Sequence, residues 1–325
     1  MKAIYIQNYY LATVSEFKMI PNILNEKLAS RIIDNPFFVK YVKTLKNNSW
    51  CFFIEEYIQG ISLYDLFQTV KLAGSISFCC FHLACLILIL DALKELGIVH
   101  RNIKPENIII TKNGYPKLID FSCCKKIDSN KTRTIVGSPL FISPEVLIGS
   151  GYSYSCDYWE IGILIYFLFF GEYPFGSRTS QPDTIYEEII NKKLNFNENF
   201  IKKFSNNSQK TEKVNELIEI IEILLNKKAE ERMKNVEKLK EKKFFENIDF
   251  IKLKKMEIKA PYIPKIDKFD YQKELNNISK PFMDFRPEPV EKLKSSINDV
   301  VVINKDKREN FLEYHKNLMK WFDKF

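Results

Sequence analysis

The sequence predicts an α+β protein in which strands come early and helices dominate the remainder. Residues 37–45 and 50–58 alternate apolar and polar side chains well enough for two strands, joined by a turn at residues 46–49. Beyond Gly60 the pattern changes to that of helices. With 325 residues, of which 46% are hydrophobic, the chain can bury one large core or two unequal ones.

The elements are expected in the following order. A first helix at residues 22–33 precedes the two strands. Later helices are expected at residues 62–70, 77–97, 157–170, 182–191, 212–226 and about 235–245. The helix at 77–97 ends at Gly97, as a helix C-cap should. Short strands at 107–111 and 116–119 flank a turn, and five prolines beyond residue 258 predict an extended tail.

Charge, cysteine content and hydropathy exclude several classes of protein. Lysines of the stretch 227–259 interleave with glutamates at helical spacing, which favours solvated helix faces over a nucleic-acid patch. The seven cysteines are odd in number and lack C-x-x-C spacing, which predicts free thiols in a reducing compartment. The start shows no signal-peptide pattern, and the apolar stretches 83–90 and 161–170 are shorter than the roughly 18–20 residues that cross a bilayer. We therefore expect a cytoplasmic protein with no membrane span and no nucleic-acid partner.

Two short segments carry the chemistry. Residues 100–110 read HRNIKPENIII and residues 117–122 read KLIDFS. They resemble the catalytic loop, HRDLKPENLLI, and the metal-binding DFG loop of eukaryotic protein kinases. The resemblance implies that Lys104 lies near the moving phosphoryl group and that Asn107 and Asp120 bind Mg²⁺. Asn102 stands where the family has its catalytic aspartate, and an amide can hold a substrate hydroxyl but cannot accept its proton.

The resemblance covers nearly the whole chain. Residues 137–145 (GSPLFISPE) are similar to the end of a kinase activation segment, and residues 155–175 to the D-x-W-x-x-G helix of the large lobe. Arg232 stands where the family has the arginine that pairs with the Glu145 position. Residues 255–265 (KMEIKAPYIPK) resemble the start of the C-terminal tail of the AGC kinase group, and the chain most resembles the catalytic subunit of cAMP-dependent protein kinase.

The resemblance implies a bilobal protein-kinase-like fold with a truncated small β lobe. Residues 1–58 would form a partial small lobe, residues 59–258 a large, mainly helical lobe and residues 259–325 an AGC-type tail. The first glycine of the chain is Gly60, so the Gly-rich loop that covers the ATP phosphates in the family has no counterpart in this sequence.

The nucleotide-binding residues are also expected from the resemblance. Residues 1–4 (MKAI) resemble the strand that bears the phosphate-binding lysine, which makes Lys2 the candidate with Glu26 as its helix partner; a gapless alignment would place Gln7 there instead. Residues implied to contact the nucleotide elsewhere are Glu56, Ile58, Phe282 and Phe285. The tail motif FMDF at 282–285 has a competing candidate in FDY at 269–271.

Regulatory parts of the family have counterparts as well. Thr134 aligns with the activation-loop threonine, and Arg101 and Lys125 are expected to clamp its phosphate. Phe322 and Phe325, in the final FDKF, resemble the two phenylalanines that plug a groove beside the small-lobe helix.

Five further positions depart from the family pattern. Ser122 replaces the glycine of DFG. Glu55 aligns with the residue that lines the back of the adenine pocket in the family, where an apolar side chain is usual, and a carboxylate buried there would need a partner or a raised pKa. Glu106 is retained among the acids that hold substrate arginines in basophilic relatives. The other three acid positions are occupied by Ser62, Leu140 and Phe167.

Two functions from different classes follow. Loss of the catalytic base removes a contribution of about 10²–10⁴-fold. Together with the missing phosphate cover, this favours a pseudokinase that serves as a scaffold or binding module. The alternatives are an active Ser/Thr kinase with an N-terminally truncated gene model, and a divergent remnant without a stable fold. The implied cofactors are ATP and Mg²⁺. The expected partners are a protein substrate or protein partner and a regulatory subunit, on a monomeric chain.

Overall fold

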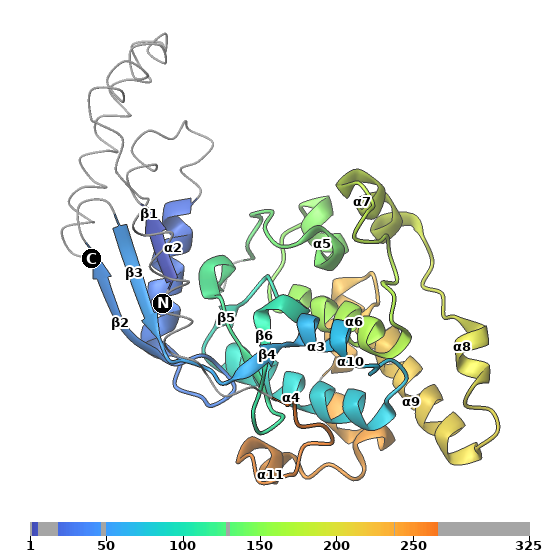
Figure 1. Cartoon of the computed structure of the whole chain (residues 1–325). Helices are drawn as coiled ribbons and strands as arrows, with labels where there is room; N and C mark the ends of the chain where they lie inside the picture. Colours follow the sequence, from blue (N-terminus) through green and yellow to red (C-terminus); the bar gives the residue numbers. More distant parts are fainter. Residues whose placement is uncertain (1, 6–18, 47–49, 128–130, 237, 266–325) are drawn as a thin grey trace. The chain divides into compact units, whose positions relative to one another are not determined.

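The computed structural model describes residues 2–5, 19–46, 50–127, 131–236 and 238–265, and it divides into two compact units (Figure 1). One unit consists of residues 1–17, 44–54 and 267–325, and the other of residues 18–43 and 55–266. The predicted domain division at residues 58 and 258 stays a prediction. Several predicted residues lie outside the described part of the chain, namely Gln7, residues 269–271, Phe282, Phe285, Phe322 and Phe325.

The first unit contains β1 (Lys2–Tyr5) and most of β3 (Trp50–Glu55). These strands pair antiparallel, with Lys2 opposite Phe53 and Tyr5 opposite Trp50. With β2 (Tyr41–Lys46) they form a three-stranded sheet in the order β1-β3-β2. Both predicted strands are therefore present, but each is shorter than expected.

The strand predicted at 37–45 is shortened because its first residues have another partner. Phe38 forms a bridge with Leu118, and the N–H of Val39 donates to the carbonyl of Leu118 at 3.0 Å. These residues are therefore hydrogen-bonded to the segment that leads into the loop of Asp120. The preceding helix, α2 (Met19–Ile32), confirms the helix predicted at 22–33.

The second unit is built on long apolar helices. α6 (Ser155–Phe170) is buried along its whole length, and α4 (Ile76–Glu95) and α9 (Ser208–Leu224) pack against it. Each fully buried Leu, Ile or Phe contributes roughly 1.5–3 kcal/mol to stability, so these helices supply much of the core. Within the described residues, the other α-helices of this unit besides α2 are α3 (Leu63–Thr69), α5 (Pro144–Ile148), α7 (Pro182–Asn191), α8 (Glu198–Lys202), α10 (Ala229–Val236) and α11 (Phe250–Lys254).

α4 is the one helix in the described part of the chain that is long and apolar enough to cross a membrane by length and composition. Of its most apolar window, 72% is buried inside the fold. That degree of burial is typical of the core helix of a globular domain.

The helix predicted at about 235–245 is wrong. Instead α10 ends at Val236, and two 3₁₀ turns follow at Leu239–Glu241 and Lys243–Phe245. Leu239, Phe244 and Phe245 are all buried. In one continuous α-helix, residues five apart would point about 140° away from each other, so the turns are needed to bring these side chains into the core.

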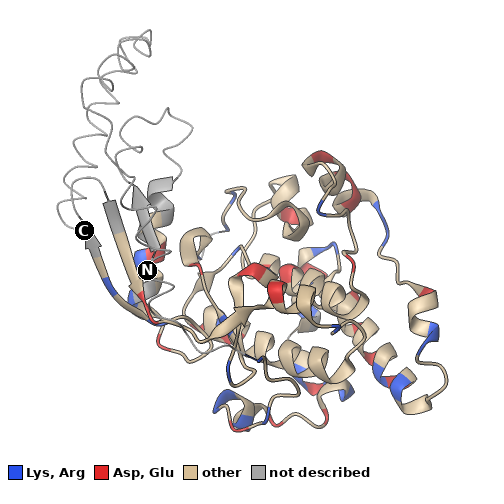
Figure 2. Cartoon of the chain, in the orientation of Figure 1, with Lys and Arg blue, Asp and Glu red and all other residues tan. Residues whose placement is uncertain are grey.

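The lysine-rich stretch 227–259 has the solvated character that its interleaved glutamates predict. Lysines and arginines are intermixed with acids over the outer helices (Figure 2). Lys242 and Lys243 form ion pairs with Glu219 and Glu212 of α9, respectively.

Short strands position the two motif loops. β4 (Gly60–Ser62), β6 (Ile108–Thr111) and β7 (Pro116–Leu118) form one antiparallel sheet, and β5 (Ile98–Val99) pairs with β8 (Lys125–Lys126). The loop with Asn102 therefore runs from β5 to β6, and the loop with Asp120 runs from β7 to β8. The backbone N–H of Ile119 donates to the carbonyl of Asn107 at 2.9 Å and joins the two loops.

Candidate active site

The loop that carries Asn102 is anchored by a buried carboxyl group of α6. Asp157 accepts hydrogen bonds from the backbone N–H groups of His100 and Arg101, both at 2.8 Å. Because Asp157 is 1% exposed, an unpaired carboxylate there would be costly, and these two bonds offset part of that cost. Burial still outweighs them and raises the pKa of Asp157 to about 6. Arg101 adopts a left-handed backbone conformation (φ 66°), which is strained for a residue with a side chain. The surrounding packing therefore holds a loop shape that the isolated backbone would disfavour.

Asn102 and Lys104 are linked through Ser138. The Lys104 ammonium donates to Ser138 Oγ at 2.9 Å, and Ser138 Oγ donates to Asn102 Oδ1 at 3.2 Å. The backbone carbonyl of Asn102 accepts from Asn107 Nδ2 at 2.9 Å. Three of the predicted catalytic residues are thus held in one network, with a neutral amide at the predicted base position.

The loop of Asp120 is also held in a specific shape. Asp120 adopts a left-handed conformation (φ 63°), and its side chain accepts from the N–H of Ser122 at 3.4 Å. Phe121 is fully buried and packs edge-on against His100, with ring centroids 5.1 Å apart. The ring of Phe38 also packs against the Phe121 ring, with centroids 5.9 Å apart. Burial of Phe121 therefore fixes the turn at Asp120, and the residue before it, Ile119, is hydrogen-bonded to the carbonyl of Asn107.

The oxygen atoms of Asp120 and Asn107 are of the kind that binds magnesium, and their role as metal ligands stays a prediction. Mg²⁺ prefers oxygen ligands, and the site offers the Asp120 carboxylate and the Asn107 amide oxygen. Asn107 uses its Nδ2 toward Asn102, which leaves its Oδ1 as the atom that could face a cation. When bound, Mg²⁺-ATP would supply the γ-phosphoryl group and a positive charge to neutralise the charge that develops on it.

The segment that follows β3 is tied to the rest of the second unit by Glu56. Its carboxylate accepts from the N–H of Lys40 at 2.8 Å and forms an ion pair with Lys117. Burial alone would raise the pKa of Glu56, but these two donors outweigh burial and lower it below the usual value. The roles predicted for Glu56 and Ile58 in nucleotide binding stay predictions, as does the pairing of Lys2, on β1, with Glu26.

Tyr41 joins two acids of the second unit. Its hydroxyl donates to Glu26 Oε1 at 3.2 Å and is also hydrogen-bonded to Glu55. Burial, together with these two carboxyl groups, raises the pKa of Tyr41 far above its ordinary value, so the phenol stays protonated. The Tyr41 hydroxyl is therefore the partner that a buried carboxyl group at Glu55 needs.

The segment around Thr134 is attached to the catalytic loop by Tyr152. Arg101 Nη1 donates to the Tyr152 hydroxyl at 3.2 Å, and that hydroxyl donates to the backbone carbonyl of Thr134. Lys125 donates to Thr132 Oγ1 at 3.0 Å. Arg101 and Lys125 thus both lie beside this segment, and the phosphate clamp on Thr134 stays a prediction.

The predicted pair of Glu145 and Arg232 is confirmed. Arg232 is fully buried, forms an ion pair with Glu145, and donates from Nε to the carbonyl of Ser155 at 3.0 Å. The guanidinium also lies 5.4 Å from the centroid of the Trp159 ring. This pair joins α5, α6 and α10 inside the second unit and therefore has a structural role.

Glu160 is the residue that the sequence analysis missed. It is 3% exposed, and its Oε2 accepts from the backbone N–H of Ile103 at 2.6 Å. Its Oε1 lies close to the backbone at Gly137, where an added Cβ would be 3.8 Å away. α6 thus supplies a second carboxyl group behind the loop of Asn102. An acid inside an otherwise apolar helix was a signal that could have identified it.

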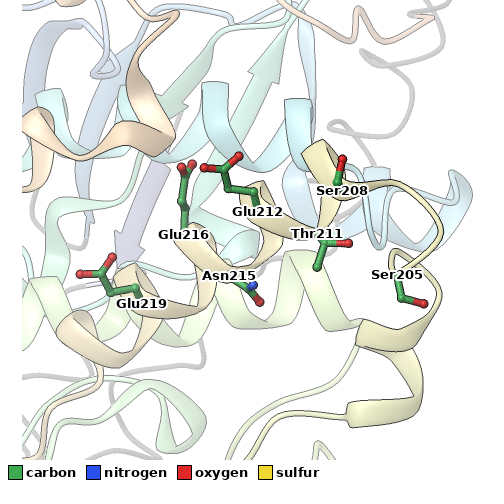
Figure 3. Close-up of a pocket in the computed structure, with 7 residues that line it drawn as sticks. All are labelled: Ser205, Ser208, Thr211, Glu212, Asn215, Glu216 and Glu219. Atoms are coloured by element: carbon green, nitrogen blue, oxygen red, sulfur yellow. The ribbon is translucent and has the colours of Figure 1, made fainter.

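A groove of about 560 Å³ lies elsewhere on the second unit, along α9 and the segment before it (Figure 3). None of the predicted site residues lines it. Its acids Glu212, Glu216 and Glu219 form ion pairs with Lys243, Lys213 and Lys242. We therefore treat it as a feature of the outer surface.

The fold and the two loops define a protein kinase domain. The sequence profile of the protein kinase domain family matches residues 10–245, and the chain belongs to this family. The predicted AGC-like kinase identity and the predicted α+β, protein-kinase-like fold are thus confirmed.

Three relatives illustrate the similarity. A cGMP-dependent protein kinase of Eimeria tenella is 31% identical over 236 residues, which cover 71% of this chain and 22% of that protein. A cGMP-dependent protein kinase of Plasmodium berghei is 36% identical over 184 residues, 57% of this chain and 21% of that protein. A cAMP-dependent protein kinase catalytic subunit-like protein of Caenorhabditis elegans is 29% identical over 255 residues, 77% of this chain and 60% of that protein. The match thus spans about a fifth of the length of the two cGMP-dependent relatives.

Proposed function

We propose that this chain is an AGC-like serine/threonine protein kinase homologue in which phosphoryl transfer is weak or lost. On this proposal it works as a pseudokinase, a kinase fold kept as a scaffold or binding module for a protein partner. We also propose a cytoplasmic, monomeric protein for which a regulatory subunit is one partner.

The observation that carries this proposal is the state of Asn102. The amide is 8% exposed, and its oxygen is engaged by Ser138 at 3.2 Å. A carboxylate in that place would accept the proton of a substrate hydroxyl, whereas the amide has no basic atom for it. At 1.36 kcal/mol per factor of ten, the loss of a general base corresponds to roughly 3–5 kcal/mol of activation free energy.

A second candidate function is an active but slow Ser/Thr kinase. The features that favour it are the left-handed conformations of Arg101 and Asp120, the buried Phe121, and the network that holds Lys104. In phosphoryl transfer most of the acceleration comes from positioning and metal electrostatics, so a base is not indispensable.

The test is transfer of the γ-phosphate from Mg²⁺-ATP to a Ser/Thr peptide library. The full chain is compared with Asp120→Ala, which removes a predicted metal ligand, and with Asn102→Asp. We expect equal background in the wild-type chain and in Asp120→Ala. Transfer by the wild-type chain that disappears in Asp120→Ala would overturn the pseudokinase proposal and favour the slow kinase.

Binding of Mg²⁺-ATP is measured in parallel as a shift of the melting temperature. If the wild-type chain binds Mg²⁺-ATP, we expect Asn102→Asp to raise transfer by about 10²-fold or more, because the new carboxylate can act as a base. Binding without any gain would mean that the base is not the limiting defect.

A further inference from the structure

The helix α11, at the lower edge of the second unit (Figure 1), carries an exposed isoleucine among lysines. Ile251 is 72% exposed, the largest exposure of any big apolar side chain in the described part of the chain. Lys254 and Lys255 follow it by three and four residues, so these three side chains share one face of the helix. Leu253 points away from that face and is fully buried. The outer face of α11 is therefore an apolar tip flanked by cations.

The lysines of this face are not neutralised by neighbouring acids. Residues 250–265 contain five lysines and one glutamate, a net charge of +4. Within the described ranges, neither Lys254 nor Lys255 forms an ion pair, and Lys252 reaches Asp249 only at 4.0 Å. Lysines shortly before this segment, in contrast, pair with acids of α9, where both charges are intermixed (Figure 2). The positive charge of α11 is thus available to an external partner.

The core holds this face in a fixed conformation. The Asp249 carboxylate caps the helix by accepting from the backbone N–H of Ile251 at 3.0 Å. The helix ends at Met256, which has a left-handed φ of 59°. Beyond it, the Tyr115 hydroxyl donates to the carbonyl of Ile258 at 2.5 Å, and α11 itself packs on α4. Because the face is preformed, binding to it carries little cost for ordering the chain.

An anionic lipid surface fits this face better than a protein or a nucleic acid does. Protein interfaces are enriched in aromatic residues and arginine and depleted in lysine, whereas this face offers lysines and one isoleucine. A nucleic-acid backbone attracts lysines but has no apolar layer for Ile251. A bilayer with anionic headgroups attracts each lysine and also accepts an apolar side chain at the boundary between headgroups and acyl chains.

We propose that the outer face of α11 binds the surface of a membrane that contains anionic phospholipids. Lys252, Lys254 and Lys255 contact the headgroups, and Ile251 inserts between them. The chain then lies on the membrane without crossing it. Binding is weak and reversible, because the contact consists of one apolar side chain and a few charges. The proposal does not depend on whether the chain transfers phosphate.

The experiment is co-sedimentation of the full chain with sucrose-loaded vesicles in the absence of nucleotide. Vesicles of phosphatidylcholine alone are compared with vesicles that also contain about 30% phosphatidylserine, whose negative surface potential attracts lysines. The variants are Ile251→Ser and the double variant Lys254→Gln with Lys255→Gln. The replaced side chains are exposed, so an unchanged melting temperature should confirm that each variant is folded.

Two matched controls carry the same substitutions elsewhere on the second unit. Ile148→Ser replaces an isoleucine of α5 that is 67% exposed. The double variant Lys202→Gln with Lys203→Gln replaces two adjacent exposed lysines at the end of α8, a helix as short as α11.

We expect the wild-type chain to bind the phosphatidylserine vesicles and not those of phosphatidylcholine alone. At about fivefold per lysine, the double variant of Lys254 and Lys255 should bind about 25-fold more weakly. Ile251→Ser should bind about tenfold more weakly, because less apolar surface leaves water. Both controls should stay within about twofold of the wild-type chain.

Three results would overturn the proposal. One is equal binding, or no binding, of the wild-type chain to the two kinds of vesicle. Another is a loss in the controls as large as the loss in the α11 variants. The third is a loss in the double lysine variant without any loss in Ile251→Ser, because charge alone would then explain binding and a soluble polyanion would be the better partner. Since the readout contains no nucleotide, a failure here is distinct from a failure of the phosphoryl-transfer test.

Discussion

The buried carboxyl group of Glu160 gives a quantitative test of how α6 supports the catalytic loop. Glu160→Ala leaves the N–H of Ile103 buried without its acceptor, which costs about 1–3 kcal/mol. The small cavity left by the deleted atoms adds about 1 kcal/mol, so we expect a loss of about 2–4 kcal/mol in the free energy of unfolding. Glu160→Gln keeps an oxygen for Ile103 and should retain most of this stability.

The pH dependence of stability separates the role of Glu160 as a hydrogen-bond acceptor from the effect of its ionisation. Burial, reinforced by the nearby charge of Asp157, raises the pKa of Glu160 well above its usual range. A carboxyl group with a raised pKa in the folded state stabilises the fold while it is protonated, and this contribution is lost as the pH rises through that pKa. Glutamine cannot ionise, so Glu160→Gln should gain stability relative to the wild-type chain as the pH rises.

The assay is urea unfolding at pH 6 and pH 9, followed by intrinsic tryptophan fluorescence, to which the buried Trp159 contributes. The wild-type chain, Glu160→Ala and Glu160→Gln are compared at each pH. The reasoning would be refuted if Glu160→Gln were as unstable as Glu160→Ala at pH 6. A difference between Glu160→Gln and the wild-type chain that does not change with pH would refute it equally.

Two other predictions concern buried groups far from the reacting atoms. Arg232→Met should lower the free energy of unfolding by about 3–5 kcal/mol, because it strands the Glu145 charge in the core; denaturant unfolding measures this, and a loss below 1 kcal/mol would contradict it. Burial lowers the pKa of His82 from 6.5 to about 4. The unfolded chain therefore takes up a proton first as the pH falls below 6.5, and wild-type stability should fall by about 3 kcal/mol more than that of His82→Asn between pH 7 and pH 4. Parallel stability curves for the two chains would disprove this.

The sequence predicted the regular parts of this fold because they depend on local patterns. Helical spacing located α2, α4, α6 and α9, and of the two predicted short strands one follows the loop of Asn102 and the other precedes the loop of Asp120. The Glu145–Arg232 pair was predictable only by resemblance, since its members are 87 residues apart. The helix predicted at 235–245 does not form, because Leu239 and Phe244 are both buried and a continuous α-helix would point them in different directions.

The contacts that distinguish this chain from its family pattern could not be predicted in the same way. Arg178 and Glu106 are 72 residues apart, and Ile103 and Glu160 are 57 apart. Each contact depends on how α6 and the turns beside it pack. The acid in the apolar helix was visible in the sequence, but its hydrogen-bond partner was not.

The link that Tyr41 makes between Glu26 and Glu55 has a consequence for inhibitor chemistry. The resemblance implies that Glu55 lies at the back of the adenine pocket, where the family has an apolar side chain, and here that carboxyl group has a phenol beside it. At that position a hydrogen-bond donor on a small molecule would find acceptor oxygens, whereas a purely hydrophobic group would have to desolvate the acid. On this placement, ligands that discriminate this chain from its relatives should carry a hydrogen-bond donor at this end, and those developed against an apolar wall should bind it poorly.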